Sequence, residues 1–255
     1  MAHSQWTDKI ELIDFGVPNE LSKYLLLFIS YNHPGEQESI YHNFNHTLEV
    51  ANTSLNIVCK IGFYNKWKVL VCLAGLLHDI DPSRIHNTPP SVDRTIEFID
   101  SNEEIKNIIN WFCEIFRFTV GQLKTLILAT DYDYNPEKRV KKWDKFVNEC
   151  EIHFWGEFFL TKHNQFTNLG LVLGEILAYS DKLATYIQPI DIVLQRIRGL
   201  ALELRTSNKS NLPTNIDLTS KTGHFIYSEL VKHNLFNITP IIYQDRLLDN
   251  LRFFE

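Results

Sequence analysis

The strongest constraint in this 255-residue sequence is an apolar run that ends in two ionisable residues. Residues 69–77 read Val-Leu-Val-Cys-Leu-Ala-Gly-Leu-Leu, and His78 and Asp79 follow directly. The run predicts a buried helix over Lys68–Leu77, which brings His78 and Asp79 to the edge of the interior. Burying ionisable groups costs free energy unless they are paired or bind a cation. Imidazole nitrogen and carboxylate oxygen are both ligands for divalent metals, so the run predicts part of a metal site.

Two further predicted helices carry ionisable residues on apolar faces. The first begins near Tyr41 or Phe44 and ends near Ile61, and if its whole length is helical, His42 and His46 lie one turn apart on the same side. The second, Leu169–Tyr186, contains Asp181 within an apolar run. His46 and Asp181 are therefore candidates to join His78 and Asp79. For Asp181, an ion pair at the surface with Lys182 or Arg196 is the alternative.

The sequence predicts an all-α fold with an ample core, because hydrophobic residues make up 44% of the chain and no β-alternation or repeat is convincing. Trp111, Trp143 and Trp155 fall at helical positions and are expected in the core. The other expected helices, bounded by apolar periodicity, caps, glycine and proline, are Leu21–Tyr31, Ser91–Ile99, Asn102–Phe116, Gln122–Thr130, Val140–Phe159, Pro189–Arg205, Thr222–Asn234 and Pro240–Phe254.

The charge and cysteine content limit the partners and the compartment. The formal net charge of −6 argues against binding to duplex nucleic acid, which needs clustered basic residues, and favours a small-molecule partner. The four cysteines are widely spaced without a CxxC motif, which is typical of reduced thiols in a cytoplasmic protein. Neither a long apolar span nor an apolar signal-peptide segment is evident, so we expect neither membrane insertion nor secretion.

The order His46, then His78-Asp79, then Asp181 resembles the HD-domain superfamily of metal-dependent phosphohydrolases. The resemblance is closer to the branch of cyclic nucleotide phosphodiesterases, whose first motif reads Tyr-His-Asn-x-x-His with an acidic residue three positions later. Residues 41–46 read Tyr-His-Asn-Phe-Asn-His, and Glu49 follows at the expected distance. Residues 126–131, Leu-Ile-Leu-Ala-Thr-Asp, look like a second stretch of that branch. The similarity covers roughly residues 40 to 190.

The resemblance implies the roles of the site residues. It makes His46, His78, Asp79 and Asp181 the metal ligands, with Asp79 bridging two divalent ions of Mn, Mg, Zn or Fe. It makes His42 the acid that protonates the leaving oxygen, so that His42 and Asp79 are the catalytic residues.

Three positions near these motifs carry open alternatives. The phosphodiesterase pattern has a histidine three residues after His-Asp, where this chain has Pro82, and His86 in the following loop could take its place. His86 and Asp131 are candidates for a second metal or for substrate, although His86 could instead be solvated and Asp131 could be a turn-former or helix cap. Glu49 is expected either to orient a ligand histidine or to lie exposed.

The chemistry of phosphoester hydrolysis fits these residues. Two ions can acidify a water and neutralise the phosphoryl oxygens, and a histidine with a pKa of about 6.5 can protonate the leaving group. We therefore expect a metal-dependent phosphohydrolase acting on a nucleotide phosphoester, with a cyclic nucleotide as first candidate. An HD-fold di-iron oxygenase and a catalytically silent nucleotide-sensing module are the alternatives. Residues 1–206 are expected to form the HD-type hydrolase domain, an HD helical bundle, and residues 207–255 a helical extension packed on it.

Overall fold

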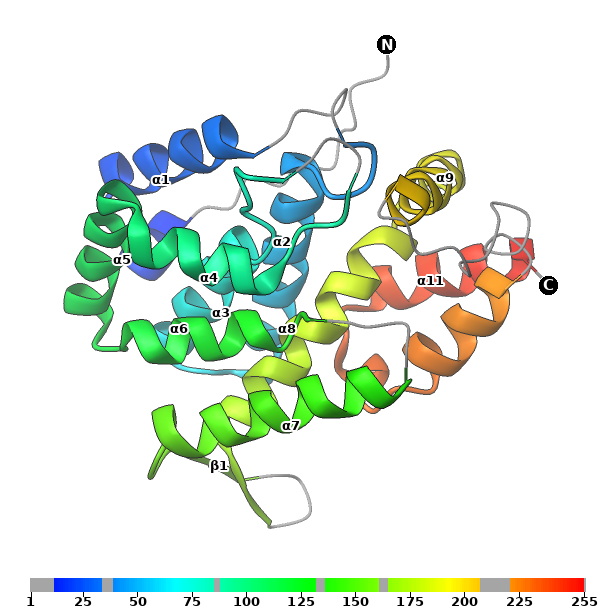
Figure 1. The fold of residues 1–255 in the computed structure, drawn as a ribbon. Helices are drawn as coiled ribbons and strands as arrows, with labels where there is room; N and C mark the ends of the chain where they lie inside the picture. The colour runs from blue at the N-terminus through cyan, green and yellow to red at the C-terminus, as the bar shows by residue number, and fades with distance from the viewer. Residues whose placement is uncertain are drawn as a thin grey trace.

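The computed structural model describes residues 12–33, 39–84, 88–131, 136–160, 165–206 and 221–254 (Figure 1). Its elements in chain order are η1 (Leu12–Phe15), α1 (Asn19–Asn32), α2 (Phe44–Ile61), α3 (Asn65–Leu77), α4 (Val92–Ser101), α5 (Glu103–Phe116), α6 (Val120–Leu128), α7 (Pro136–His153), β1 (Phe158–Leu160), β2 (Phe166–Asn168), α8 (Leu169–Tyr186), α9 (Ile190–Thr206), η2 (Ile226–Val231), η3 (Phe236–Ile238) and α11 (Ile241–Phe254).

The predicted all-α class is confirmed, with one small exception. Strands β1 and β2 form an antiparallel hairpin that pairs Phe158 with Asn168, and it is the only sheet among the described residues. The predicted helix Val140–Phe159 was therefore too long at its end. Helix α7 stops at His153, and Gly156 adopts a left-handed φ of 76° that turns the chain into the hairpin.

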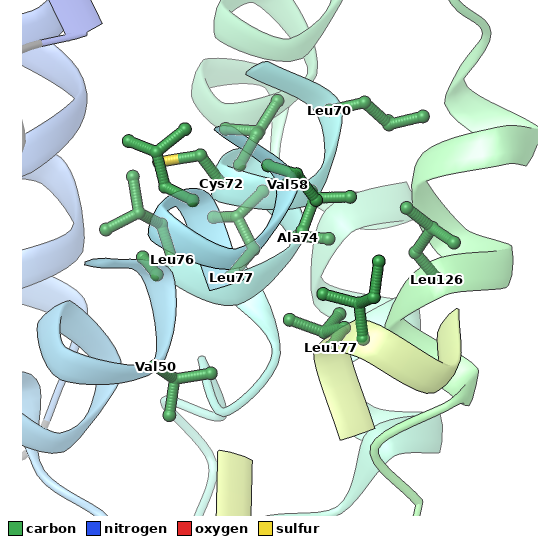
Figure 2. Close-up of a cluster of buried hydrophobic side chains, with 14 of the residues drawn as sticks. Val50, Val58, Leu70, Cys72, Ala74, Leu76, Leu77, Leu126 and Leu177 are labelled. Atoms are coloured by element: carbon green, nitrogen blue, oxygen red, sulfur yellow. The ribbon is translucent and has the colours of Figure 1, made fainter. Parts of the chain in front are cut away.

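Helix α3 is the centre of the core because it is buried on nearly every side. All residues from Val69 to Leu77 are buried, as their continuous apolar character predicts. Figure 2 shows α3 side chains such as Leu70 and Leu77 among residues of three other helices: Val50 and Val58 from α2, Leu126 from α6 and Leu177 from α8.

The contact between α2 and α3 is unusually close at Gly75. A Cβ atom added there would lie 2.9 Å from the Cα of Ala51, a distance that real Cβ atoms essentially never show. Glycine at this position therefore lets the two helix backbones approach each other. This approach brings the start of α2 and the end of α3, which carry the predicted site residues, to the same region.

Helix α8 crosses this pair and joins the core to the C-terminal helices. In Figure 1, α8 runs through the middle of the molecule, and it contacts α2, α3, α6, η2 and α11. The Asn250 side-chain amide on α11 donates to the backbone carbonyls of Tyr186 and Gln188 at 2.7 and 2.9 Å. The predicted boundary between residues 206 and 207 borders a segment, 207–220, that lies outside the described residues.

The three tryptophans expected in the core are exposed instead. Trp111 lies off the buried stripe of α5, which consists of Ile105, Ile108, Ile109 and Phe112, and its residue surface is 49% exposed. Trp143 on α7 is 43% exposed, and Trp155 lies beyond the end of α7 at 86%. Aromatic character alone was thus a poor guide to burial.

Two other sequence expectations concern cysteines and membrane insertion. The four cysteines are free, with Cys72 and Cys150 buried and Cys59 and Cys113 partly buried. None of the helices in the described part of the chain combines the length and the apolar character needed to cross a bilayer.

We predict that Gly75→Ala destabilises the fold, because the added methyl group must push α2 away from α3. Overpacking of this kind costs about 1–3 kcal/mol of unfolding free energy. Chemical denaturation of the two proteins measures the difference. An unchanged unfolding free energy would mean that the α2–α3 contact does not require glycine.

Candidate metal centre

His46 is fixed at the start of α2 by a helix cap. The side chain of Asn43 accepts a hydrogen bond of 3.1 Å from the backbone N–H of His46, which satisfies one of the free amides of the first turn. The helix therefore begins inside the 41–46 motif, and His46 is fully buried. The sequence left open whether this helix begins at Tyr41 or at Phe44. In the structure it begins at Phe44, so His42 precedes the helix.

His78 and Asp79 lie where α3 ends. The Nδ1 atom of His78 is 2.8 Å from the carbonyl oxygen of Gly75, and because a carbonyl can only accept, Nδ1 carries the proton. In the neutral imidazole the lone pair is then on Nε2, the arrangement of a metal-ligating histidine. Asp81, two residues after Asp79, has a structural role: its carboxylate accepts hydrogen bonds from the Arg94 side chain and from the backbone N–H of Ser91.

Four residues from three helices converge, as the sequence predicted. The Nε2 atom of His46 is 3.0 Å from Asp181 Oδ1 and 3.9 Å from Asp79 Oδ2. The Nε2 atom of His78 is 3.1 Å from Asp79 Oδ2 and 3.6 Å from Asp181 Oδ1. Potential ligand atoms of His46, His78 and Asp79 all lie within 4.8 Å of one another.

The electrostatics of this cluster suit a cation. Burial alone would raise the pKa values of Asp79 and Asp181, but the neighbouring histidines outweigh it and hold both carboxyls below their ordinary range. Burial would lower the pKa of His78, yet Asp79 and Asp181 raise it well above the ordinary value. The buried Asp79 and the partly buried Asp181 therefore both favour the ionised form.

The hydrogen bonding of the cluster is incomplete within the protein. His78 Nε2 and Asp79 Oδ2 are buried without a hydrogen-bond partner, although they lie 3.1 Å apart. An unsatisfied buried polar atom is costly, whereas a divalent ion would bind both atoms once it displaces the proton of His78 Nε2. Two imidazole nitrogens and two carboxylates are a donor set for borderline divalent metals. The residues thus fit the predicted metal, and their role as ligands stays a prediction.

His42 lies beside this cluster, and its partner is a residue that sequence reasoning missed. Its ring centroid is 5.8 Å from that of His46, and its Nδ1 is 2.5 Å from Oε2 of Glu203 on α9. The other carboxylate oxygen, Oε1, accepts from the Ser39 hydroxyl and from the backbone N–H groups of Tyr41 and His42. The buried Glu203 carboxylate therefore fixes both the backbone and the ring of His42.

This pairing changes the protonation of His42. Burial disfavours the imidazolium, but the negative charges of Glu203 and Asp79 outweigh burial and raise the pKa of His42 above its ordinary value of 6.5. The raised pKa favours the protonated form of His42. It can therefore act as an acid.

The periodicity of α9 contained a signal for Glu203. Val193, Arg196, Ile197 and Leu204 are buried along one face of this helix, and Glu203 falls on the same face. A carboxylate on an otherwise buried stripe requires a partner. The partner is 161 residues away in sequence, so spacing alone could not identify it.

The remaining candidates have separate outcomes. His86 lies outside the described residues. Asp131 forms an ion pair with Lys142 and lines a pocket together with Asp181. Glu49 was expected either to orient a ligand histidine or to lie exposed. Its carboxylate instead pairs with the Arg196 guanidinium, with one contact of 2.7 Å.

The pairing of Glu49 also bears on the alternative for Asp181. Arg196 is engaged by Glu49, and Lys182 is 3.3 Å from Glu229. Asp181 itself faces His46 and His78, as described above. The ion pair of Asp181 with Lys182 or Arg196 at the surface is therefore not what the structure has.

Two more polar residues near the cluster were absent from the sequence predictions. His33, at the end of α1, is buried, and its Nε2 is 2.9 Å from the Thr47 hydroxyl. Burial lowers its pKa to about 3, so it is neutral. The Arg84 guanidinium donates to the carbonyl of His42 at 2.8 Å and thereby supports the loop that carries His42.

Comparison with known proteins adds a structural neighbour. No protein-family model and no curated protein matches the sequence. Among solved structures, the chain is similar to the phosphodiesterase domain of the rhodopsin phosphodiesterase of Salpingoeca rosetta, with a TM-score of 0.61 and 16% sequence identity. The match covers 96% of this chain and 82% of that one. The two chains therefore share a fold, and the predicted all-α bundle with C-terminal helices agrees with it.

We predict that Asp79→Ala abolishes stoichiometric binding of a divalent metal, because the Asp79 carboxylate lies near the Nε2 atoms of both His46 and His78. His42→Ala should keep the metal, since the partner of His42 is Glu203. Elemental analysis of the purified variants measures both. Loss of metal from His42→Ala would instead assign His42 to the ligand set.

Proposed function

We propose that the protein is a metal-dependent phosphodiesterase-like hydrolase that cleaves a phosphoester of a nucleotide. The observation that carries the proposal is the His42–Glu203 pair, which favours a protonated imidazole beside a buried cluster of metal-type donors. The fold shared with a phosphodiesterase domain supports the same chemistry.

The division of labour follows from the geometry. His46, His78, Asp79 and Asp181 would hold divalent ions, which in bound form polarise phosphoryl oxygens and acidify water. In the imidazolium form of His42, Nδ1–H donates to Glu203 and Nε2–H is the proton that remains for the substrate. Donation of the Nε2 proton to the departing ester oxygen avoids a poor alkoxide leaving group.

The proposed acid supports a choice between substrates. Protonation matters most for an alkoxide such as a ribose oxygen, so a cyclic nucleotide is our first candidate and a linear nucleotide ester the second. The ring of Tyr41, whose centroid lies 4.4 Å from that of His42, is an aromatic surface on which a base could stack. In a protein with a net charge of −6, the ions and local basic residues supply the attraction for an anion.

The test is hydrolysis of cyclic and linear nucleotides by protein loaded with Mn²⁺ or Mg²⁺. We expect turnover of at least one nucleotide ester, and His42→Ala should lower kcat by a factor on the order of 10² to 10⁴, the usual contribution of a positioned acid. Wild-type protein that leaves every ester intact contradicts the proposal. Metal-dependent oxygen consumption would point to the oxygenase, and nucleotide binding without turnover to the sensing module.

A second prediction concerns the pH profile. The acid is active while His42 is protonated, so activity falls as the pH rises through its pKa. Glu203→Gln removes the largest charge that raises this pKa, so burial, which lowers it, is opposed only by Asp79 and Asp181. The alkaline limb of the pH profile of kcat should therefore move to lower pH, by on the order of one pH unit. A reduced kcat with an unchanged alkaline limb would assign Glu203 a purely structural part.

A further inference from the structure

One arginine beside the candidate metal centre uses only part of its hydrogen-bonding capacity. The Arg84 guanidinium donates from Nη2 to the carbonyl oxygen of His42 at 2.8 Å. Its Nη1 atom is buried and has no hydrogen-bond partner among the residues that the structure describes. Arg94, by contrast, pairs with the Asp81 carboxylate at 2.8 Å. The described partner of Arg84 is therefore a neutral carbonyl rather than a carboxylate.

We propose that Arg84 binds a phosphoryl oxygen of the substrate through Nη1, while Nη2 stays on the carbonyl of His42. The inference rests on the proposed function, which puts a phosphoester at the metal centre next to His42. It adds a protein side chain that recognises the anion, a task that neither the four candidate ligands nor the proposed acid performs.

The position of Arg84 is the first support. The carbonyl that accepts from it belongs to His42, so the guanidinium lies against the loop that precedes α2. Burial is the largest reason that the pKa of His33 is low, the Asp79 carboxylate opposes burial, and the charge of Arg84 lowers this pKa further. His33 is thus within electrostatic reach of both the guanidinium and a candidate metal ligand.

A second buried nitrogen is the next support. His33 is buried, and its Nδ1, like Nη1 of Arg84, has no hydrogen-bond partner in the described part of the chain. Its Nε2 is 2.9 Å from the Thr47 hydroxyl, which can donate to Nε2 and leave the ring proton on Nδ1. Buried donors cost free energy when nothing accepts from them. A ligand with several acceptor oxygens would lower this cost.

A phosphoryl group suits Arg84 for chemical reasons. A hydrogen bond between two charged groups is roughly twice as strong as one between neutral groups. The guanidinium is planar and always charged, so one nitrogen can stay on the carbonyl of His42 while the other binds an anion. The side chains of His42 and Asp181 are 16% and 22% exposed, which gives an anion access to the centre from solvent.

The test is the affinity of inorganic phosphate for Mg²⁺-loaded protein, measured by calorimetry, because phosphate binding needs no turnover. Arg84→Ala should raise the Kd of phosphate at least about tenfold, the size of a lost hydrogen bond between charged groups. Arg84→Lys keeps a charged donor, so its Kd should lie between those of wild type and Arg84→Ala. Arg94→Ala is the matched control: it removes the same charge and an anchor of the same loop at Asp81, and it should leave the Kd unchanged.

Elemental analysis of Arg84→Ala should show an unchanged metal content. Loss of the metal, an unchanged Kd in Arg84→Ala, or an equal loss of affinity in Arg94→Ala would each overturn the phosphoryl contact. An Arg84→Lys protein that binds phosphate no more tightly than Arg84→Ala would overturn it too, as would metal-loaded wild type that binds no phosphate.

The outcomes also separate this contact from the proposed function. Hydrolysis of nucleotide esters by a protein whose phosphate affinity does not depend on Arg84 would retain the proposed function and reject the contact. Phosphate binding that depends on Arg84 in a protein that hydrolyses no ester would do the reverse.

Discussion

The structure depends on one costly arrangement, in which two buried imidazoles and the buried Asp79 carboxylate meet the partly buried Asp181 between α2, α3 and α8. Buried charges need partners, and here the protein supplies only incomplete ones, since His78 Nε2 and Asp79 Oδ2 have no hydrogen bond. The close approach of α2 and α3 at Gly75 makes the meeting possible, and the Gly75 carbonyl also orients His78. A bound cation would compensate the charges that this packing brings together.

The proposed acid and the pocket that Asp181 lines lie on different elements around this cluster. His42 is held by Glu203 of α9 and supported by Arg84, whereas the basic residues of the pocket come from α7 and α8. Because the core fixes His42 relative to the four candidate ligands, a phosphoester held by a metal there would meet the proposed proton donor without a large rearrangement. The α-helical scaffold is shared with a phosphodiesterase domain at 16% sequence identity, so the proposed role of His42 rests on the contacts of this chain's own residues.

The sequence predicted the helices and the convergence of the four candidate ligands, because both follow from apolar periodicity and from ionisable residues that interrupt it. It did not predict the β1–β2 hairpin, Glu203 or the exposure of Trp155. The hairpin follows a left-handed glycine, and the partner of Glu203 is His42, in a loop 161 residues away in sequence. Trp155 lies just past a helix end, where periodicity no longer reports burial. Tertiary contacts and chain turns, rather than local patterns, decide these cases.

The central claim is that His46, His78, Asp79 and Asp181 ligate a metal, and anomalous X-ray scattering from a zinc-loaded crystal tests it most directly. We predict an anomalous peak at about 2.0–2.2 Å from Nε2 of both histidines and from a carboxylate oxygen of each aspartate. A fully loaded crystal whose zinc lies elsewhere, with the two histidines still paired to the aspartates, would contradict the claim.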